Sequence, residues 1–100
     1  MAFVQIIEFP TSRIDEMRAL DGEWEAATKG RRTATRSTLC ADRDRPGVCV
    51  MMVEFPSYEA AMENSRLPET NRIAEQMQKL SDGGEPTFRN LDVVETHELK

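Results

Sequence analysis

Residues 48–57, VCVMMVEFPS, combine the longest apolar run of the chain with an abrupt stop. The run is rich in valine and methionine and ends in phenylalanine, a composition typical of a buried strand. Pro56 and Ser57 then end the strand and begin a helical pattern. A second copy of this junction lies 46 residues upstream (52 − 6), where residues 6–11 (IIEFPT) match residues 52–57 (MVEFPS). The repeat indicates two strand-to-helix units, each followed by another strand.

The spacing of apolar and turn-forming residues predicts the other elements. In the first helix, Ile14, Met17, Leu20 (or Asp21) and Trp24 recur every three or four positions, with Thr11 or Ser12 as its cap. We expect strands at 3–9, 33–41, 48–55 and 86–95, a helix from 14 to 27, and a helix from 58 that Pro68 interrupts before a second segment ending at 80. This order predicts a single α+β domain over residues 1–100, a ferredoxin-like βαββαβ sandwich with an antiparallel sheet.

The composition sets limits on function. With 39% hydrophobic and 31% charged residues the chain is typical of a globular domain, and its net charge of −5 disfavours nucleic acid or an anionic membrane as the main partner. The amino terminus has no basic leader, and no apolar run approaches the ~18 residues of a membrane span. Two cysteines do not make a secreted disulfide framework. We therefore expect a cytoplasmic protein.

Basic residues gather in one part of this acidic chain. Residues 29–45 contain six basic and two acidic side chains, a local charge of +4 (6 − 2). This cluster would attract an anionic small ligand, or it is the solvated rim of a hairpin; both interpretations remain open.

Strands 3–9 and 48–55 are apolar on both faces, although the helices of this fold cover only one. The other face must therefore be covered, most simply by a second copy of the chain, so we expect a homodimer that closes into an α/β barrel.

Strand alternation divides the candidate site residues between the two faces. If the hairpin at 42–47 is symmetric, paired residues sum to 89, so that Cys40 faces Cys49 and Arg36 faces Val53. One face then holds the purer apolar set, which we assign to the helices: Val4, Ile6, Leu39, Val48, Val50 and Met52. The other face would line the cavity of the dimer and bind a substrate through Gln5, Arg36, Thr38 and Met51, with both cysteines nearby.

Arg36 is the most specific candidate, because a charge on an apolar strand must pair or reach water. It would stabilise negative charge on a bound carboxylate, phenolate or enolate, or it forms an ion pair with Glu8, Glu54 or Asp92. Cys40 and Cys49 are either a cross-strand disulfide or two reduced residues, which a cytosolic protein favours.

The chain resembles the dimeric α/β-barrel superfamily, particularly the antibiotic biosynthesis monooxygenase-like domains. The resemblance is carried by residues 3–10, 48–55, the helix SYEAAMENS at 57–65, LPET at 67–70 and residues 73–80. It implies a homodimer that holds a small substrate in a cavity between sheet and helices. The implied substrate is apolar, aromatic or polyketide-like, and either neutral or anionic. It also implies oxidation by dioxygen without a cofactor, or a non-catalytic binding or stress-related dimer of the same fold.

Some members of this family place asparagine, tryptophan, tyrosine and arginine around the substrate. Asn64 and Tyr58 match this set in residue type and helix position, whereas Trp24 does not match in place. We therefore expect Arg36 and Asn64 to be catalytic and Tyr58 to help bind the substrate. Haem-degrading relatives use a helix histidine, but the one histidine here, His97, lies near the carboxy terminus, which argues against haem chemistry.

Overall fold

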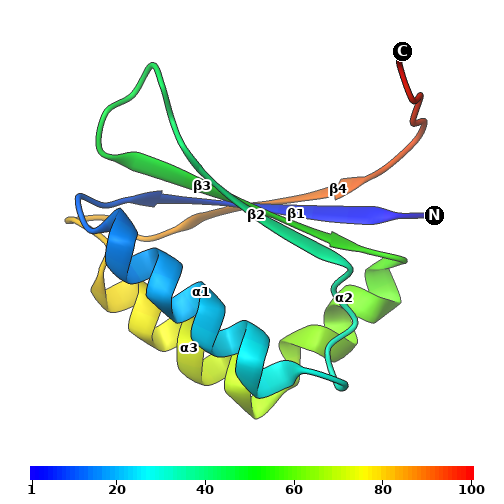
Figure 1. Ribbon diagram of the computed structural model, residues 1–100, viewed down its shortest axis with the longest axis horizontal. Helices are drawn as coiled ribbons and strands as arrows, with labels where there is room; N and C mark the ends of the chain where they lie inside the picture. Colours follow the sequence, from blue (N-terminus) through cyan, green and yellow to red (C-terminus); the bar gives the residue numbers. More distant parts are fainter.

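The computed structural model describes residues 1–100, which form four strands and three helices (Figure 1). In chain order these are β1 (Phe3–Pro10), α1 (Ile14–Thr28), β2 (Arg36–Ala41), β3 (Val48–Phe55), α2 (Tyr58–Ser65), α3 (Pro68–Lys79) and β4 (Thr87–Asp92). The strands form one antiparallel sheet in the order β2-β3-β1-β4. The predicted ferredoxin-like α+β fold is confirmed.

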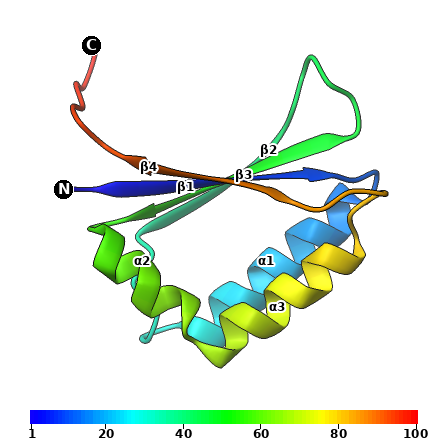
Figure 2. The same ribbon diagram turned by 180° about the vertical axis from the view of Figure 1, so that it is seen from behind.

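All three helices lie on one face of the sheet, with α1 and α3 side by side (Figures 1 and 2). Figure 2, seen from behind, shows that the opposite face carries no helix. We call this uncovered side the open face. The residues after β4 run away from the sheet toward the carboxy terminus (Figure 1). No helix is long and apolar enough to cross a membrane.

Local sequence signals determine where the second and third helices begin, as the sequence predicts. The Ser57 hydroxyl accepts a hydrogen bond from Ala60 N at 3.1 Å and so caps α2. Pro68 occupies the first turn of α3, where a missing amide hydrogen costs no helical hydrogen bond. The predicted side-chain cap of α1 is wrong, because Arg13 holds that position and makes no capping bond. Thr11 instead donates to the Leu80 carbonyl at 2.8 Å and ties the end of β1 to the end of α3.

The core lies between the sheet and the helices and corrects the expected assignment of strand faces. Its strand residues are the bulky Phe3, Phe9, Met51 and Phe55 with Cys49 and Val53, while Val4, Ile6, Val48, Val50 and Met52 point to the open face. Gln5 therefore lies under the helices, and of the purer apolar set only Leu39 does. Aromatic and methionine side chains are long enough to fill the layer between sheet and helices, which explains this choice of face.

The register of the β2–β3 hairpin also differs from the expected one by a single residue. Ala41 pairs with Cys49 and Arg36 with Glu54, so that paired residues sum to 90 rather than 89. The Asp42 carboxylate accepts hydrogen bonds from the amides of Asp44 and Arg45, which makes the turn asymmetric. A one-residue shift moves each side chain to the opposite face.

As a result, Arg36, Thr38 and Cys40 lie on the open face, and Ser37 and Leu39 point toward the helices. Cys40 and Cys49 are on opposite faces and are not bonded to each other.

Candidate functional site

Two adjoining pockets lie between the sheet and the helices. The inner pocket has a volume of about 100 Å³ and is mostly apolar, with walls from β1, β3 and α3 that include Ile7, Met51, Val53, Phe55, Ile73 and Met77. The outer pocket, of about 190 Å³, lies between α1 and β2 and is mostly polar. Asp21, Trp24 and Ser37 line both pockets and form the junction between them.

Two amide side chains bring hydrogen-bonding groups to the apolar inner pocket. Gln5 on β1 donates through Nε2 to Asn90 Oδ1 at 3.2 Å, which leaves its own carbonyl oxygen available. Asn64 on α2 is 6% exposed, and its Oδ1 accepts a long 3.4 Å bond from Thr33 N. Its amino group has no protein partner. An apolar pocket with a few polar groups is the usual form of a small-molecule site.

Trp24 is held in a fixed position between the two pockets. Its indole Nε1 donates to Thr70 Oγ1 at 2.8 Å, which joins α1 to α3. The Arg32 guanidinium lies over the indole ring at 5.8 Å from its centroid and donates to the Glu25 carbonyl at 2.7 Å. These contacts occupy both the indole nitrogen and one ring face, so that Trp24 forms a rigid wall.

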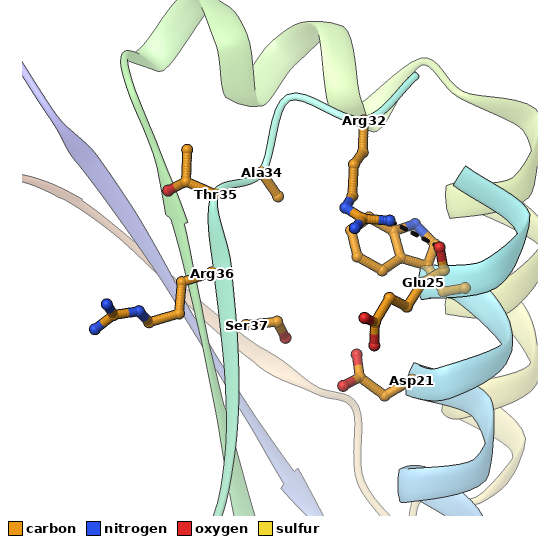
Figure 3. A pocket seen from close by; sticks show the side chains of 8 residues that line it. Asp21, Glu25, Arg32, Ala34, Thr35, Arg36 and Ser37 are labelled. Carbon is orange, nitrogen blue, oxygen red and sulfur yellow. Dashed lines mark hydrogen bonds between the residues drawn. The ribbon is translucent and has the colours of Figure 1, made fainter. Parts of the chain in front are cut away.

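Asp21 and Ser37 face each other across the junction, from α1 and β2 (Figure 3). The Ser37 hydroxyl oxygen is buried and has no hydrogen-bond partner. Burial raises the pKa of the Asp21 carboxyl, and the nearby charge of Glu25 raises this pKa further. The Ser37 hydroxyl beside the carboxyl acts in the opposite direction and lowers this pKa. The junction thus contains a basic carboxylate next to an unpaired hydroxyl.

The structure brings together three of the six predicted site residues. Gln5, Met51 and Asn64 line the inner pocket. Arg36 borders the outer pocket, but its side chain points away (Figure 3) and is 3.6 Å from Glu54 in an exposed ion pair. Thr38 lies on the open face opposite Met52. Tyr58 is 51% exposed and packs edge-on against Phe3, away from both pockets.

Of the three junction residues, Asp21 and Trp24 were expected only as positions on the first helix, and Ser37 was not expected at a site. Asp21 lies four positions after the buried Met17 and three before Trp24, a spacing that turns it toward the sheet. This helical spacing was the available signal. No sequence pattern placed Ser37 at the junction, because the face of the sheet on which it lies depends on the register of the hairpin.

The remaining reactive side chains lie elsewhere. His97 is exposed in the carboxy-terminal segment, 2.9 Å from Glu95. Burial raises the pKa of the Cys49 thiol, which disfavours the reactive thiolate. No three histidine, cysteine or acidic side chains lie close enough together to hold a metal ion.

We compared the chain with family models, curated proteins and solved structures. No family model and no curated protein matches the chain. Among solved structures, an antibiotic biosynthesis monooxygenase superposes with a TM-score of 0.73 and 21% identity over 95% of this chain and 100% of that one. SnoaB, a cofactor-independent oxygenase from Streptomyces nogalater, superposes with a TM-score of 0.77 and 16% identity over 95% of each chain. The chain has the antibiotic biosynthesis monooxygenase-like fold.

The same monooxygenase-like fold occurs in Rv0793 from Mycobacterium tuberculosis, with a TM-score of 0.78 and 17% identity over 98% of this chain and 100% of that one. These identities are too low to carry individual residue roles from one protein to another. The pockets and their side chains must therefore support any assignment of function.

Proposed function

We propose that the protein is a cofactor-independent oxygenase that oxidises a small aromatic substrate in the inner pocket. The observation that carries this proposal is the apolar pocket between sheet and helices, into which Gln5 and Asn64 bring amide groups. Its fold is that of SnoaB, which is itself a cofactor-independent oxygenase. An apolar pocket excludes water, which strengthens the interaction of fixed dipoles with a developing negative charge.

The proposed reaction needs only the substrate and dioxygen. A hydroxyl-bearing aromatic ring gives its hydroxyl proton to the Asp21 carboxylate, which lines the same pocket and later returns the proton to the peroxide, and the negative charge spreads to a ring carbon. That carbon forms a bond to O₂, and the resulting peroxide loses water as its O–O bond breaks. A hydroquinone and one O₂ thus give a hydroxyquinone and one water, and each product receives one of the two atoms of the O₂. The amino group of Asn64 would stabilise the oxyanion, and Gln5 would orient the ring.

We further propose that the protein acts as a homodimer whose open faces pack together. Val4, Ile6, Val50 and Met52 form an apolar surface there that no helix covers. Ion pairs border it, with Glu8 at 3.0 Å from Arg45 and 3.2 Å from Arg89. An apolar centre with a charged rim is typical of a protein interface. In this arrangement the pockets stay on the helical side of each sheet.

Oxygen uptake by the purified protein with a panel of hydroquinones and phenols, in the presence of a metal chelator, tests the proposed activity. We expect uptake with release of one water per O₂ and a roughly 100-fold loss in Asn64→Ala, as for removal of one oxyanion donor. Arg36→Ala is the matched control, because this side chain points away from the pocket, and it should retain full activity. Bound ligands that leave chemically unchanged would instead indicate a binding protein.

A further inference from the structure

We propose that Asp21 and Ser37 form a hydroxyl-recognition subsite, which selects a neutral single aromatic ring carrying a hydroxyl group and rejects aromatic carboxylates. This inference rests on the proposed function for the place of the substrate, but it concerns binding and can be tested without turnover. It differs from the expectation, drawn from the basic residues at 29–45, that an anionic ligand is favoured.

The junction has unused hydrogen-bonding capacity. The Ser37 hydroxyl oxygen is buried without a partner, and buried polar groups without partners are rare in folded proteins. Asp21 faces it from α1, and an ionised carboxylate can only accept hydrogen bonds. A ligand hydroxyl placed between them would donate its proton to Asp21 and accept a hydrogen bond from Ser37. A methyl ether in the same place could not donate to Asp21.

The charge around the junction disfavours an anionic ligand. Asp21 and Glu25 are both acidic and lie one helical turn apart on α1. The one cation lining the outer pocket with its side chain toward it is Arg32, which is already held by the Glu25 carbonyl and the Trp24 ring. An aromatic carboxylate would therefore meet two acidic side chains with no free cation, and it would be repelled.

The basic residues at 29–45 do not change this balance. Arg31 is paired with Glu69, Arg36 with Glu54, and Arg45 with Glu8 and Asp42. These three charges are held in separate ion pairs on different elements, and Lys29 and Arg43 line neither pocket. Opposite charges at contact distance largely cancel each other's attraction for a distant ligand. The net charge of +4 at residues 29–45 therefore does not create an anion-binding site at the junction.

The volume of the inner pocket limits the size of the ligand. The inner pocket, at about 100 Å³, is smaller than the ~300–1,000 Å³ of pockets for drug-sized ligands. An engineered protein cavity of ~150 Å³ binds benzene, so a pocket on this scale suits one ring. With the ring among Met51, Val53 and Ile73, its hydroxyl would reach back to the junction with the outer pocket. A fused polycyclic substrate would require these walls to move.

Calorimetric titration under nitrogen with phenol, anisole, benzoate and 1-naphthol tests the subsite without oxidation. We expect phenol to bind at least 10-fold more tightly than anisole, because a hydrogen bond to a charged group is lost in the ether. Benzoate should show no binding, and 1-naphthol should bind more weakly than phenol. Asp21→Asn should reduce phenol affinity and leave anisole affinity unchanged, whereas Ser37→Ala should reduce the affinity for both ligands, because the ether oxygen of anisole can also accept a hydrogen bond from Ser37.

Glu25→Gln is the matched control on the same helix. It should leave the preference for phenol over anisole intact, because this side chain is proposed to repel anions rather than to bind the hydroxyl. Equal affinities for phenol and anisole, or tighter binding of benzoate, would overturn the subsite. Binding without oxygen uptake would leave the subsite standing and contradict the oxygenase.

Discussion

The indole nitrogen of Trp24 on α1 donates a hydrogen bond to the hydroxyl of Thr70 on α3, at 2.8 Å across 46 positions of sequence. This bond lies at the edge of the inner pocket, where the two helices meet beneath the sheet. It satisfies the one polar group of a large, partly buried side chain. The same contact therefore joins the helices and fixes one wall of the pocket.

Replacing Thr70 tests the strength of this link. Thr70→Val removes the acceptor but keeps the shape, and it leaves the indole N–H without a partner, so we expect a loss of about 1 kcal/mol in the free energy of unfolding. Thr70→Ser keeps the hydroxyl and should lose clearly less. Urea unfolding of both variants measures the difference. Equal losses would show that the hydrogen bond contributes nothing.

Asp21→Asn should change how stability depends on pH. The folded protein raises the Asp21 pKa above its ordinary value of 3.8, chiefly through burial and then through Glu25, so the folded state holds this proton more tightly than the unfolded chain. The resulting stabilisation is complete below 3.8 and is lost as the pH rises through the raised folded pKa. Asn does not ionise, so the variant should gain stability relative to the wild type between acidic and neutral pH.

Urea unfolding of wild type and Asp21→Asn across this pH range measures the effect. Glu25→Gln provides a comparison, because it removes the charge of the neighbour and should weaken the pH dependence without abolishing it. The Arg32 guanidinium, the nearest cation lining the outer pocket, is unchanged in both variants. A stability difference between Asp21→Asn and wild type that is constant with pH would contradict the assigned pKa shift.

Ser57→Ala removes the only side-chain cap found on α1, α2 or α3. The Ala60 amide then loses its 3.1 Å partner, and we expect about 1 kcal/mol less stability. Ser65→Ala, at the exposed end of the same helix, is the matched control and should cost less, since that hydroxyl only donates to the Met62 carbonyl. Thermal unfolding of the two variants compares them directly, and the prediction fails if their midpoints coincide.

The dimer proposal predicts that charge on the open face separates the subunits. Val50→Glu places a carboxylate among the apolar residues of β3 on this face, where burial in an interface would be costly. Native mass spectrometry should give twice 11.4 kDa for the wild type and 11.4 kDa for the variant. Ala26→Glu adds the same charge on the exposed side of α1 and should stay dimeric. A monomeric wild type would contradict the proposal.

The order of the elements follows from local signals that the sequence contains. The two junctions at 6–11 and 52–57 set the strand-to-helix units, Ser57 caps α2, and Pro68 separates α2 from α3. Each of these signals depends on only a few neighbouring residues, so it can be recognised from a single sequence.

The faces of the sheet could not be assigned in this way. Strands β1 and β3 are apolar on both sides, so alternation alone does not say which side the helices cover. Side-chain size is the better guide, because the helical side contains Phe3, Phe9 and Phe55 and the open side contains valine and isoleucine. The hairpin register depended on how the Asp42 side chain folds the turn, and a shift of one residue moved Arg36 away from Gln5.

Methyl NMR during titration with phenol tests whether the pocket between sheet and helices is the ligand site. Met51 and Met77 line the inner pocket, while Met52, the next residue after Met51, lies on the open face. Saturable shifts of the Met51 and Met77 methyl signals, with Met52 unchanged, are the predicted result. Shifts at Met52 without shifts at Met51 and Met77 would place the ligand on the open face and rule out the inner pocket as its site.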